Sequence, residues 1–319
     1  MRTLTFRAPV VALALVALSL GTLVTRADAG GSPPYPVHSF TQMAANEAWW
    51  TLTGQNTARS APGVNNWDCH PSAAHPDPVV LVHGLSGNQY NGWAFVGPTL
   101  ANAGYCVFSL NHGGALWDTF IIQGTRPVNE STSEIAAFVD KVRSRTGAAK
   151  VDLVGHSLGG FLVEYVPKVV PGMAGQVDTV VALAPPTHGT TVGGVTTIVD
   201  LLGLRSAVNA LLPLIGCGAC ADLLPGGPGV TTLNTGPIAQ PGIDYTVLIS
   251  SHDSAVTPVP DAAFIREPGV HNILLQDVCP NDQSGHTGLA YNSGVTTIIT
   301  NALDPTHPAP VGCVSGLPF

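Results

Sequence analysis

A serine flanked by glycines at a strand-to-helix junction constrains the fold of this chain more than any other feature. Residues 151–154 are typical of a buried strand, and Gly155-His156-Ser157-Leu158-Gly159 follows directly. Apolar residues then recur at helical spacing over 161–169. A serine on so tight a turn needs neighbours almost free of side chains two positions before and after it, and both are glycines. The pattern predicts a nucleophile elbow, with Ser157 raised above one edge of a sheet.

Strand-like runs alternate with helical patterns along the rest of the chain. We expect strands at 78–82, 106–110, 151–154, 178–184, 245–250 and 271–275. Ser131 and Glu134 have the spacing of a capping box, which predicts that the helix before the elbow strand begins there. This alternation predicts an α/β fold with a mostly parallel central sheet and helices on both faces.

Two segments depart from this alternation. Residues 1–29 combine two early arginines, an apolar run over 8–24 and a small-x-small Ala27-Asp28-Ala29 site, which together predict a cleaved signal peptide. A membrane anchor is the weaker alternative, because the apolar run is shorter than the roughly 20 residues of a span. Residues 192–229 shift toward glycine, leucine and proline, which predicts an inserted cap or lid. No linker or repeat divides 30–319, so we expect a single domain there.

The composition limits the classes of partner. Charged residues make up only 10% of the chain and the net charge is −8. An acidic chain argues against a nucleic-acid partner, and beyond the first 29 residues no stretch is long and apolar enough to span a membrane. We therefore expect a secreted monomer that acts on an ester or acylglycerol substrate and makes at most transient contact with a lipid interface.

Six cysteines behind a signal peptide favour three disulfides, because exported proteins fold in an oxidising compartment. Cys217 and Cys220 form a local CxxC. They follow a leucine-rich segment and not a strand that opens a βαβ unit, which disfavours a redox or metal role. Cys69 and Cys106 flank the first two central strands, which leaves Cys279 to pair with Cys313.

The loop after the first predicted strand is a candidate partner of the serine. A His83-Gly84 turn leaving a central strand is expected to bring a backbone N–H close to the elbow. We predict an oxyanion hole formed by the N–H groups of Leu85 and Leu158. His83 itself is interpreted as a structural histidine that holds the turn.

The base and the acid should come from loops at the same sheet edge as the serine. His286 follows the last predicted strand, whereas His271 opens that strand at the opposite end and His252 follows an earlier one. Asp253 leaves the 245–250 strand at the correct edge, with Asp277 as the alternative acid. The resulting order of serine, aspartate and histidine is that of α/β-hydrolases, and the chemistry requires no metal or organic cofactor.

Six segments together resemble the secreted bacterial class 2 lipases of the α/β-hydrolase superfamily. They are 69–88, 104–113, 150–160, 216–234, 250–260 and 272–286. The resemblance implies a secreted carboxylic-ester hydrolase that acts on acylglycerols, with Ser157, Asp253 and His286 as its triad. It also implies a Cys69–Cys106 bridge. Leu85 departs from the pattern, because related lipases often place there a threonine whose hydroxyl can supply a third oxyanion donor.

Two alternatives share this fold. An acyltransferase would use the same triad and differ only in whether an alcohol outcompetes water for the acyl-enzyme. A non-catalytic binding protein has no physical need for a serine, an acid and a base at matching loop positions. The sequence therefore favours a serine ester hydrolase, a triacylglycerol lipase or esterase that works through a covalent acyl-enzyme.

Overall fold

A parallel sheet lies at the centre of the molecule. The computed structural model describes residues 34–55, 58–114, 122–214 and 216–319, so the predicted signal peptide at 1–29 lies outside the described residues. Within these ranges the sheet has six strands in the order β2-β1-β3-β4-β5-β6, and every neighbouring pair is parallel. The strands are β1 (Val79–Val82), β2 (Val107–Leu110), β3 (Val151–His156), β4 (Val177–Leu183), β5 (Asp244–Ile249) and β6 (Val270–Leu274).

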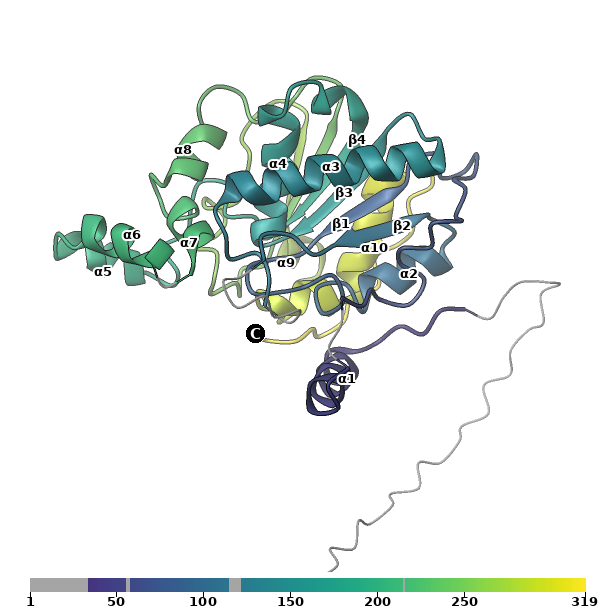
Figure 1. Ribbon diagram of the computed structural model, residues 1–319, viewed down its shortest axis with the longest axis horizontal. Helices are drawn as coiled ribbons and strands as arrows, with labels where there is room; N and C mark the ends of the chain where they lie inside the picture. Colours follow the sequence, from purple (N-terminus) through teal and green to yellow (C-terminus); the bar gives the residue numbers. More distant parts are fainter. Residues whose placement is uncertain (1–33, 56–57, 115–121, 215) are drawn as a thin grey trace, which may run out of the picture. The chain divides into compact units, whose positions relative to one another are not determined.

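Helices cover both faces of this sheet (Figure 1). On one face α3 packs against α4, and on the other α2 packs against α10. Because both faces are covered, the central strands are apolar and β1, β2 and β3 are buried along their whole length. The helices are α1 (Phe40–Leu52), α2 (Val96–Asn102), α3 (Val128–Thr146), α4 (Leu158–Val169), α5 (Val195–Leu201), α6 (Arg205–Leu214), α7 (Gly218–Asp222), α8 (Pro228–Leu233), α9 (Leu275–Val278) and α10 (Ser293–Leu303), with short 3₁₀ helices η1 (Met173–Gln176) and η2 (Thr287–Tyr291).

The predicted α/β-hydrolase architecture is confirmed, and the parallel register determines where its loops lie. Val82 of β1 pairs with Gly155 of β3, and Leu183 of β4 pairs with both His156 of β3 and Leu248 of β5. The loops that follow β1, β3, β5 and β6 therefore leave the same edge of the sheet, which we call the elbow edge.

The predicted capping box at Ser131 and Glu134 is wrong. Helix α3 begins three residues earlier, at Val128, whose N–H donates to the Asp222 carboxylate of α7 at 2.8 Å. A cap from a residue 94 positions away replaces the local one. Ser131 and Glu134 instead turn toward the loop after β2, where Glu134 Oε2 accepts from the N–H of Gly113 at 2.7 Å.

Three disulfides tie the described chain together. They join Cys69 to Cys106, Cys217 to Cys220 and Cys279 to Cys313, and no free cysteine is found in the described part. None of the helices within the described ranges is long and apolar enough to cross a membrane.

Candidate active site

Ser157 lies at a strained turn between β3 and α4. Its backbone adopts φ 58° and ψ −123°, which a non-glycine residue rarely takes. The flanking glycines are required sterically. A Cβ added at Gly155 would come within 2.1 Å of the Gly159 carbonyl oxygen, and one added at Gly159 would come within 1.9 Å of the Val82 carbonyl oxygen. The elbow therefore forms only because these two positions lack side chains.

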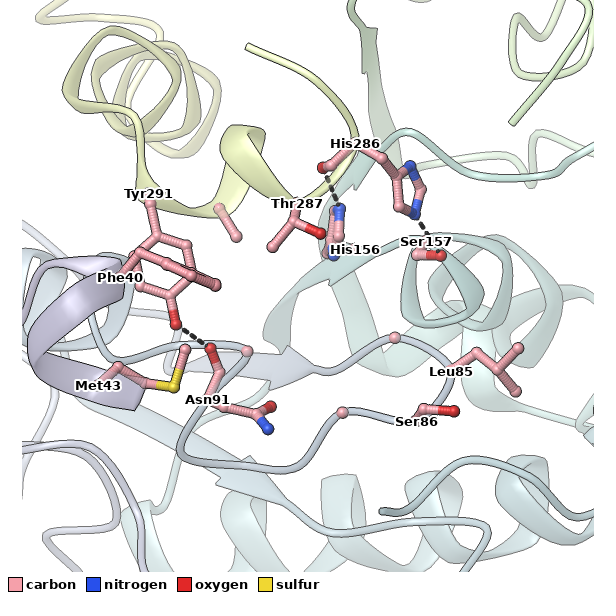
Figure 2. A pocket seen from close by; sticks show the side chains of 14 residues that line it. Phe40, Met43, Leu85, Ser86, Asn91, His156, Ser157, His286, Thr287 and Tyr291 are labelled. Atoms are coloured by element: carbon pink, nitrogen blue, oxygen red, sulfur yellow. Dashed lines mark hydrogen bonds between the residues drawn. The ribbon is translucent and has the colours of Figure 1, made fainter. Parts of the chain in front are cut away.

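Three side chains at the elbow edge form one hydrogen-bonded chain. His286 Nε2 lies 2.8 Å from Ser157 Oγ, and His286 Nδ1 lies 2.7 Å from Asp253 Oδ2. Figure 2 shows the imidazole of His286 directed at Ser157 from the loop that precedes η2. The distances fit a neutral imidazole that donates its Nδ1 proton to the carboxylate and accepts the hydroxyl proton at Nε2.

The carboxylate of Asp253 is held from both sides. Its side chain is fully buried, and Oδ1 accepts the backbone N–H groups of Ala255 at 2.9 Å and Val256 at 2.8 Å. These bonds leave Oδ2 for the imidazole and fix its direction. The alternative acid, Asp277, is exposed on the short helix α9.

The other histidines considered as bases have different surroundings. His271 is exposed on β6, and exposed His252 contacts the side-chain amide of Gln276. His83 is buried and stacks on His112 with ring centroids 4.1 Å apart. Burial lowers the pKa of His83 well below 6.5, so its ring is neutral and can accept the N–H of His112 at Nε2. Its bonds hold the turn after β1.

The loop after β1 lies against the elbow. A Cβ added at Gly84 would sit 3.0 Å from Ser157 Cβ, so the backbone that leads into Leu85 passes next to the serine. Among the described residues, the amides of Leu85 and Leu158 donate no hydrogen bond to another residue. Leu158 is also the first residue of α4, where helix N–H groups are left without intrahelical acceptors. Both amides are thus available to a ligand.

A pocket of about 240 Å³ opens beside Ser157 (Figure 2). Gly84, Leu85, His156 and His286 are among its lining residues. Phe40 and Met43 of α1 and Tyr291 of η2 line it on the side away from Ser157 in Figure 2, so much of its wall is apolar. Such a lining suits an aliphatic or aromatic group attached to a carbonyl held at the serine. Within the described residues no group of acidic, histidine and cysteine side chains is arranged to hold a metal ion.

Sequence reasoning missed the backbone hydrogen bonds that hold the loop of His286. The C-terminal tail runs along this loop: Gly285 donates its N–H to the Leu317 carbonyl at 2.8 Å, and Gly288 donates to the Phe319 carbonyl at 2.7 Å. The Cys279–Cys313 disulfide attaches the same tail. Backbone hydrogen bonds between segments about 30 residues apart leave no side-chain pattern, so only the paired cysteines signalled this contact.

Sequence comparisons relate part of this chain to known enzymes. The profile of the α/β hydrolase fold family matches residues 77–192. A triacylglycerol lipase of Burkholderia plantarii is 34% identical over 151 residues, which cover 44% of this chain and 40% of that protein. A triacylglycerol lipase of Pseudarthrobacter phenanthrenivorans is 34% identical over 113 residues, or 34% of this chain and 33% of that protein. The matched regions thus span well under half of these relatives.

Solved structures share the fold at low sequence identity. Lipase B of Aspergillus fumigatus superposes with a TM-score of 0.57 at 19% identity, covering 76% of this chain and 57% of that one. The mature lipase BlEst2 of Bacillus licheniformis superposes with a TM-score of 0.50 at 17% identity, covering 73% of this chain and 94% of that one. At these identities the likeness concerns the fold alone.

Proposed function

We propose that this chain, which belongs to the α/β-hydrolase superfamily and is related to bacterial triacylglycerol lipases, is a serine carboxylic-ester hydrolase. One observation carries the proposal: the hydrogen-bonded chain from Ser157 through His286 to Asp253, with the first two beside a pocket. A nucleophile, a base and a group that orients the base are the three parts that acyl transfer needs.

In the proposed acylation, His286 Nε2 takes the hydroxyl proton as Ser157 Oγ attacks the ester carbonyl carbon. The carbonyl electron pair moves onto its oxygen, and the N–H groups of Leu85 and Leu158 stabilise the resulting oxyanion. When the carbonyl re-forms, the imidazolium gives its proton to the leaving oxygen, so the alcohol departs. An ester of Ser157 with the acyl group remains.

Deacylation repeats these steps with water as the nucleophile. His286 takes a proton from water, the hydroxide adds to the acyl carbon, and collapse of the tetrahedral intermediate returns the proton to Ser157 Oγ. The carboxylic acid leaves, and Asp253 stabilises the imidazolium in both halves of the reaction.

We propose further that the substrates are acylglycerols with hydrophobic chains. Helices α5 and α6 project from the body of the fold (Figure 1) and expose a run of leucines, with Leu201 87% and Leu214 78% exposed. The segment begins beside the loop of Asp253, since Gly193 donates its N–H to Thr257 Oγ1 at 2.9 Å. Exposed apolar surface on a segment that begins beside the loop of Asp253 fits contact with a lipid interface.

We also propose that the protein is exported. Three disulfides persist in an oxidising compartment and are rare in the cytosol, and residues 1–29 have the pattern of a signal peptide.

The proposal is tested by hydrolysis rates of the purified protein on p-nitrophenyl esters from short to long chains, followed by emulsified triacylglycerol. We expect hydrolysis of both classes and stoichiometric labelling of Ser157 by a fluorophosphonate. Failure to hydrolyse any ester, or labelling at a residue other than Ser157, would contradict it. An added alcohol acceptor that captures most of the acyl groups would identify an acyltransferase instead.

A further inference from the structure

His156 is the residue between the end of the central strand and the proposed nucleophile. It is the last residue of β3 and precedes Ser157 directly. In the sequence it occupies the variable position between Gly155 and the serine, and nothing in the motif requires a histidine there. Its side chain is buried and lines the pocket.

The side chain of His156 contacts the main chain of the proposed base. Its Nε2 lies 2.9 Å from the carbonyl oxygen of His286, and the two imidazole rings lie 4.8 Å apart between centroids. Figure 2 shows this bond below the carbonyl of His286, separate from the bond between the His286 ring and Ser157. The two partners are 130 residues apart in sequence.

The protonation of His156 follows from its surroundings. Burial, together with the nearby His286 ring, lowers the pKa of His156 to about 3, so its imidazole is neutral in the range where ester hydrolysis runs. A carbonyl oxygen can only accept a hydrogen bond, so the single ring proton lies on Nε2. His156 is therefore a fixed donor to His286 and does not compete with it as a base.

We propose that His156 is a positioning residue, whose Nε2–H holds the main chain of His286 at working distance from Ser157 throughout the reaction. This inference rests on the proposed function. The bond joins the backbone of His286 to the residue next to Ser157. It therefore limits how far His286 can move away from Ser157.

This bond differs from the two bonds made by the His286 ring. When Ser157 carries an acyl group it has no hydroxyl proton to share, and the bond from Oγ to Nε2 is lost. The imidazole is then held by Asp253 alone, through Nδ1. The carbonyl of His286 and the ring of His156 take no part in bond making, so their contact persists in the acyl-enzyme. Deacylation should depend on it at least as strongly as acylation does.

Paired substitutions that differ in the donor test this inference. His156→Met and His156→Gln have nearly the same length and shape, but only glutamine keeps an N–H at the distance of Nε2. A displacement of the base by about 1 Å costs on the order of 100-fold in rate. We expect kcat of His156→Met to fall about 10- to 100-fold with KM within about twofold, and the deacylation rate constant to fall at least as much as the acylation rate constant. His156→Gln should stay within about threefold of the unmodified protein.

Several outcomes would overturn the positioning role. They are equal activity of the two variants, a loss that appears in KM alone, or a loss confined to acylation. If His156→Met does not fold, His156→Asn replaces it, because its amide nitrogen reaches one bond less far and the same loss of kcat is expected. Ser157→Ala, assayed in parallel, separates the two proposals. An active Ser157→Ala contradicts the proposed function, whereas an inactive Ser157→Ala beside a fully active His156→Met contradicts only the role of His156.

Discussion

The elbow edge and the α5–α6 hairpin (residues 195–214) place leucine side chains in opposite environments, one buried and one exposed. At the elbow edge Leu158 is fully buried, and the neighbouring side chains of Ser157, His286 and Asp253 are hydrogen-bonded to one another. On the hairpin Leu201, Leu202 and Leu214 are more than half exposed. Chemistry at an ester carbonyl requires atoms fixed to fractions of an ångström, which only a packed environment provides. A surface that adsorbs to lipid needs apolar area and no fixed geometry.

The largest expected effect lies at the elbow edge. Ser157→Ala removes the proposed nucleophile, so kcat should fall by roughly 10⁴- to 10⁶-fold on every ester, soluble or emulsified, with the melting temperature little changed. Hydrolysis is measured by p-nitrophenol release and by titration of fatty acid. Substantial turnover by the purified variant, whose folding is checked by circular dichroism, would show that another residue is the nucleophile.

The disulfides offer a second contrast between the two regions. Cys279–Cys313 closes a separation of 34 residues and attaches the tail that holds the His286 loop, whereas Cys217–Cys220 closes a separation of 3 residues just after the hairpin. By loop-closure entropy, Cys279→Ala/Cys313→Ala should lower the free energy of unfolding by about 4 kcal/mol, against about 2 kcal/mol for Cys217→Ala/Cys220→Ala.

Activity should separate the same two variants. Removing the tail bridge loosens the loop of the base, so kcat should fall on soluble and emulsified esters alike. Removing the short bridge should leave kcat on soluble esters within about twofold. Denaturant titration and initial rates are the measurements. A tail variant that is destabilised but fully active below its transition would show that the backbone bonds to Leu317 and Phe319 suffice.

The hairpin should be sensitive to charge only when lipid is present. A leucine that enters an apolar phase contributes about 1.5–3 kcal/mol, so Leu204→Asp or Leu211→Asp should lower rates on emulsified triacylglycerol by about tenfold or more. Rates on a soluble short-chain ester should stay within about twofold. Leu52→Asp is the matched control, because Leu52 is an exposed leucine at the end of α1, outside the hairpin. Equal losses on both substrates, or unfolding, would show that these leucines stabilise the fold and do not act at a lipid surface.

Local pattern predicted most of this fold, because each strand and helix is specified by residues adjacent in sequence. The strand predicted at 78–82 and the strand before the elbow are found as β1 and β3. The start of α3 was missed because its cap, Asp222, comes from another helix. A side chain that replaces a local cap across the tertiary structure cannot be inferred from spacing within the helix.

The candidate site likewise has a part that the sequence predicted and a part that it did not. The rule that parallel strands end at one edge selected Ser157, Asp253 and His286, and these side chains form one hydrogen-bonded chain, although their catalytic role stays a prediction. The donor role of His156 and the backbone hydrogen bonds of the tail could not be predicted, because each depends on a main-chain carbonyl. Every residue has that carbonyl, so its use in a specific contact leaves no mark in the sequence.

Helix α4, which follows the elbow, contains a buried carboxyl group that is only partly hydrogen-bonded. Glu164 lies on α4 two turns after Ser157 and is fully buried. Its Oε2 accepts from the Thr187 hydroxyl at 2.8 Å, while Oε1 has no hydrogen-bond partner among the residues that the structure describes. Burial raises the pKa of Glu164 well above 4.5, so the folded protein retains this proton to a higher pH than the unfolded chain does. The exposed hairpin has no comparable buried carboxyl among its described residues.

The smallest expected effect follows from this group and concerns stability alone. Between pH 4.5 and the raised pKa of Glu164, the unfolded chain has lost a proton that the folded chain retains, so stability falls as pH rises through that range. Glutamine cannot ionise, so Glu164→Gln should be more stable at pH 8 by on the order of 1 kcal/mol, roughly 2–4 °C in Tm. The gain should disappear below about pH 4.5, where the carboxyl is protonated in both states. Glu130→Gln, which removes an exposed carboxylate of α3 that pairs with Arg126, is the comparison variant in the same thermal melts. A Glu164→Gln variant whose Tm difference is independent of pH would show that packing at this position, and not the retained proton, sets its contribution.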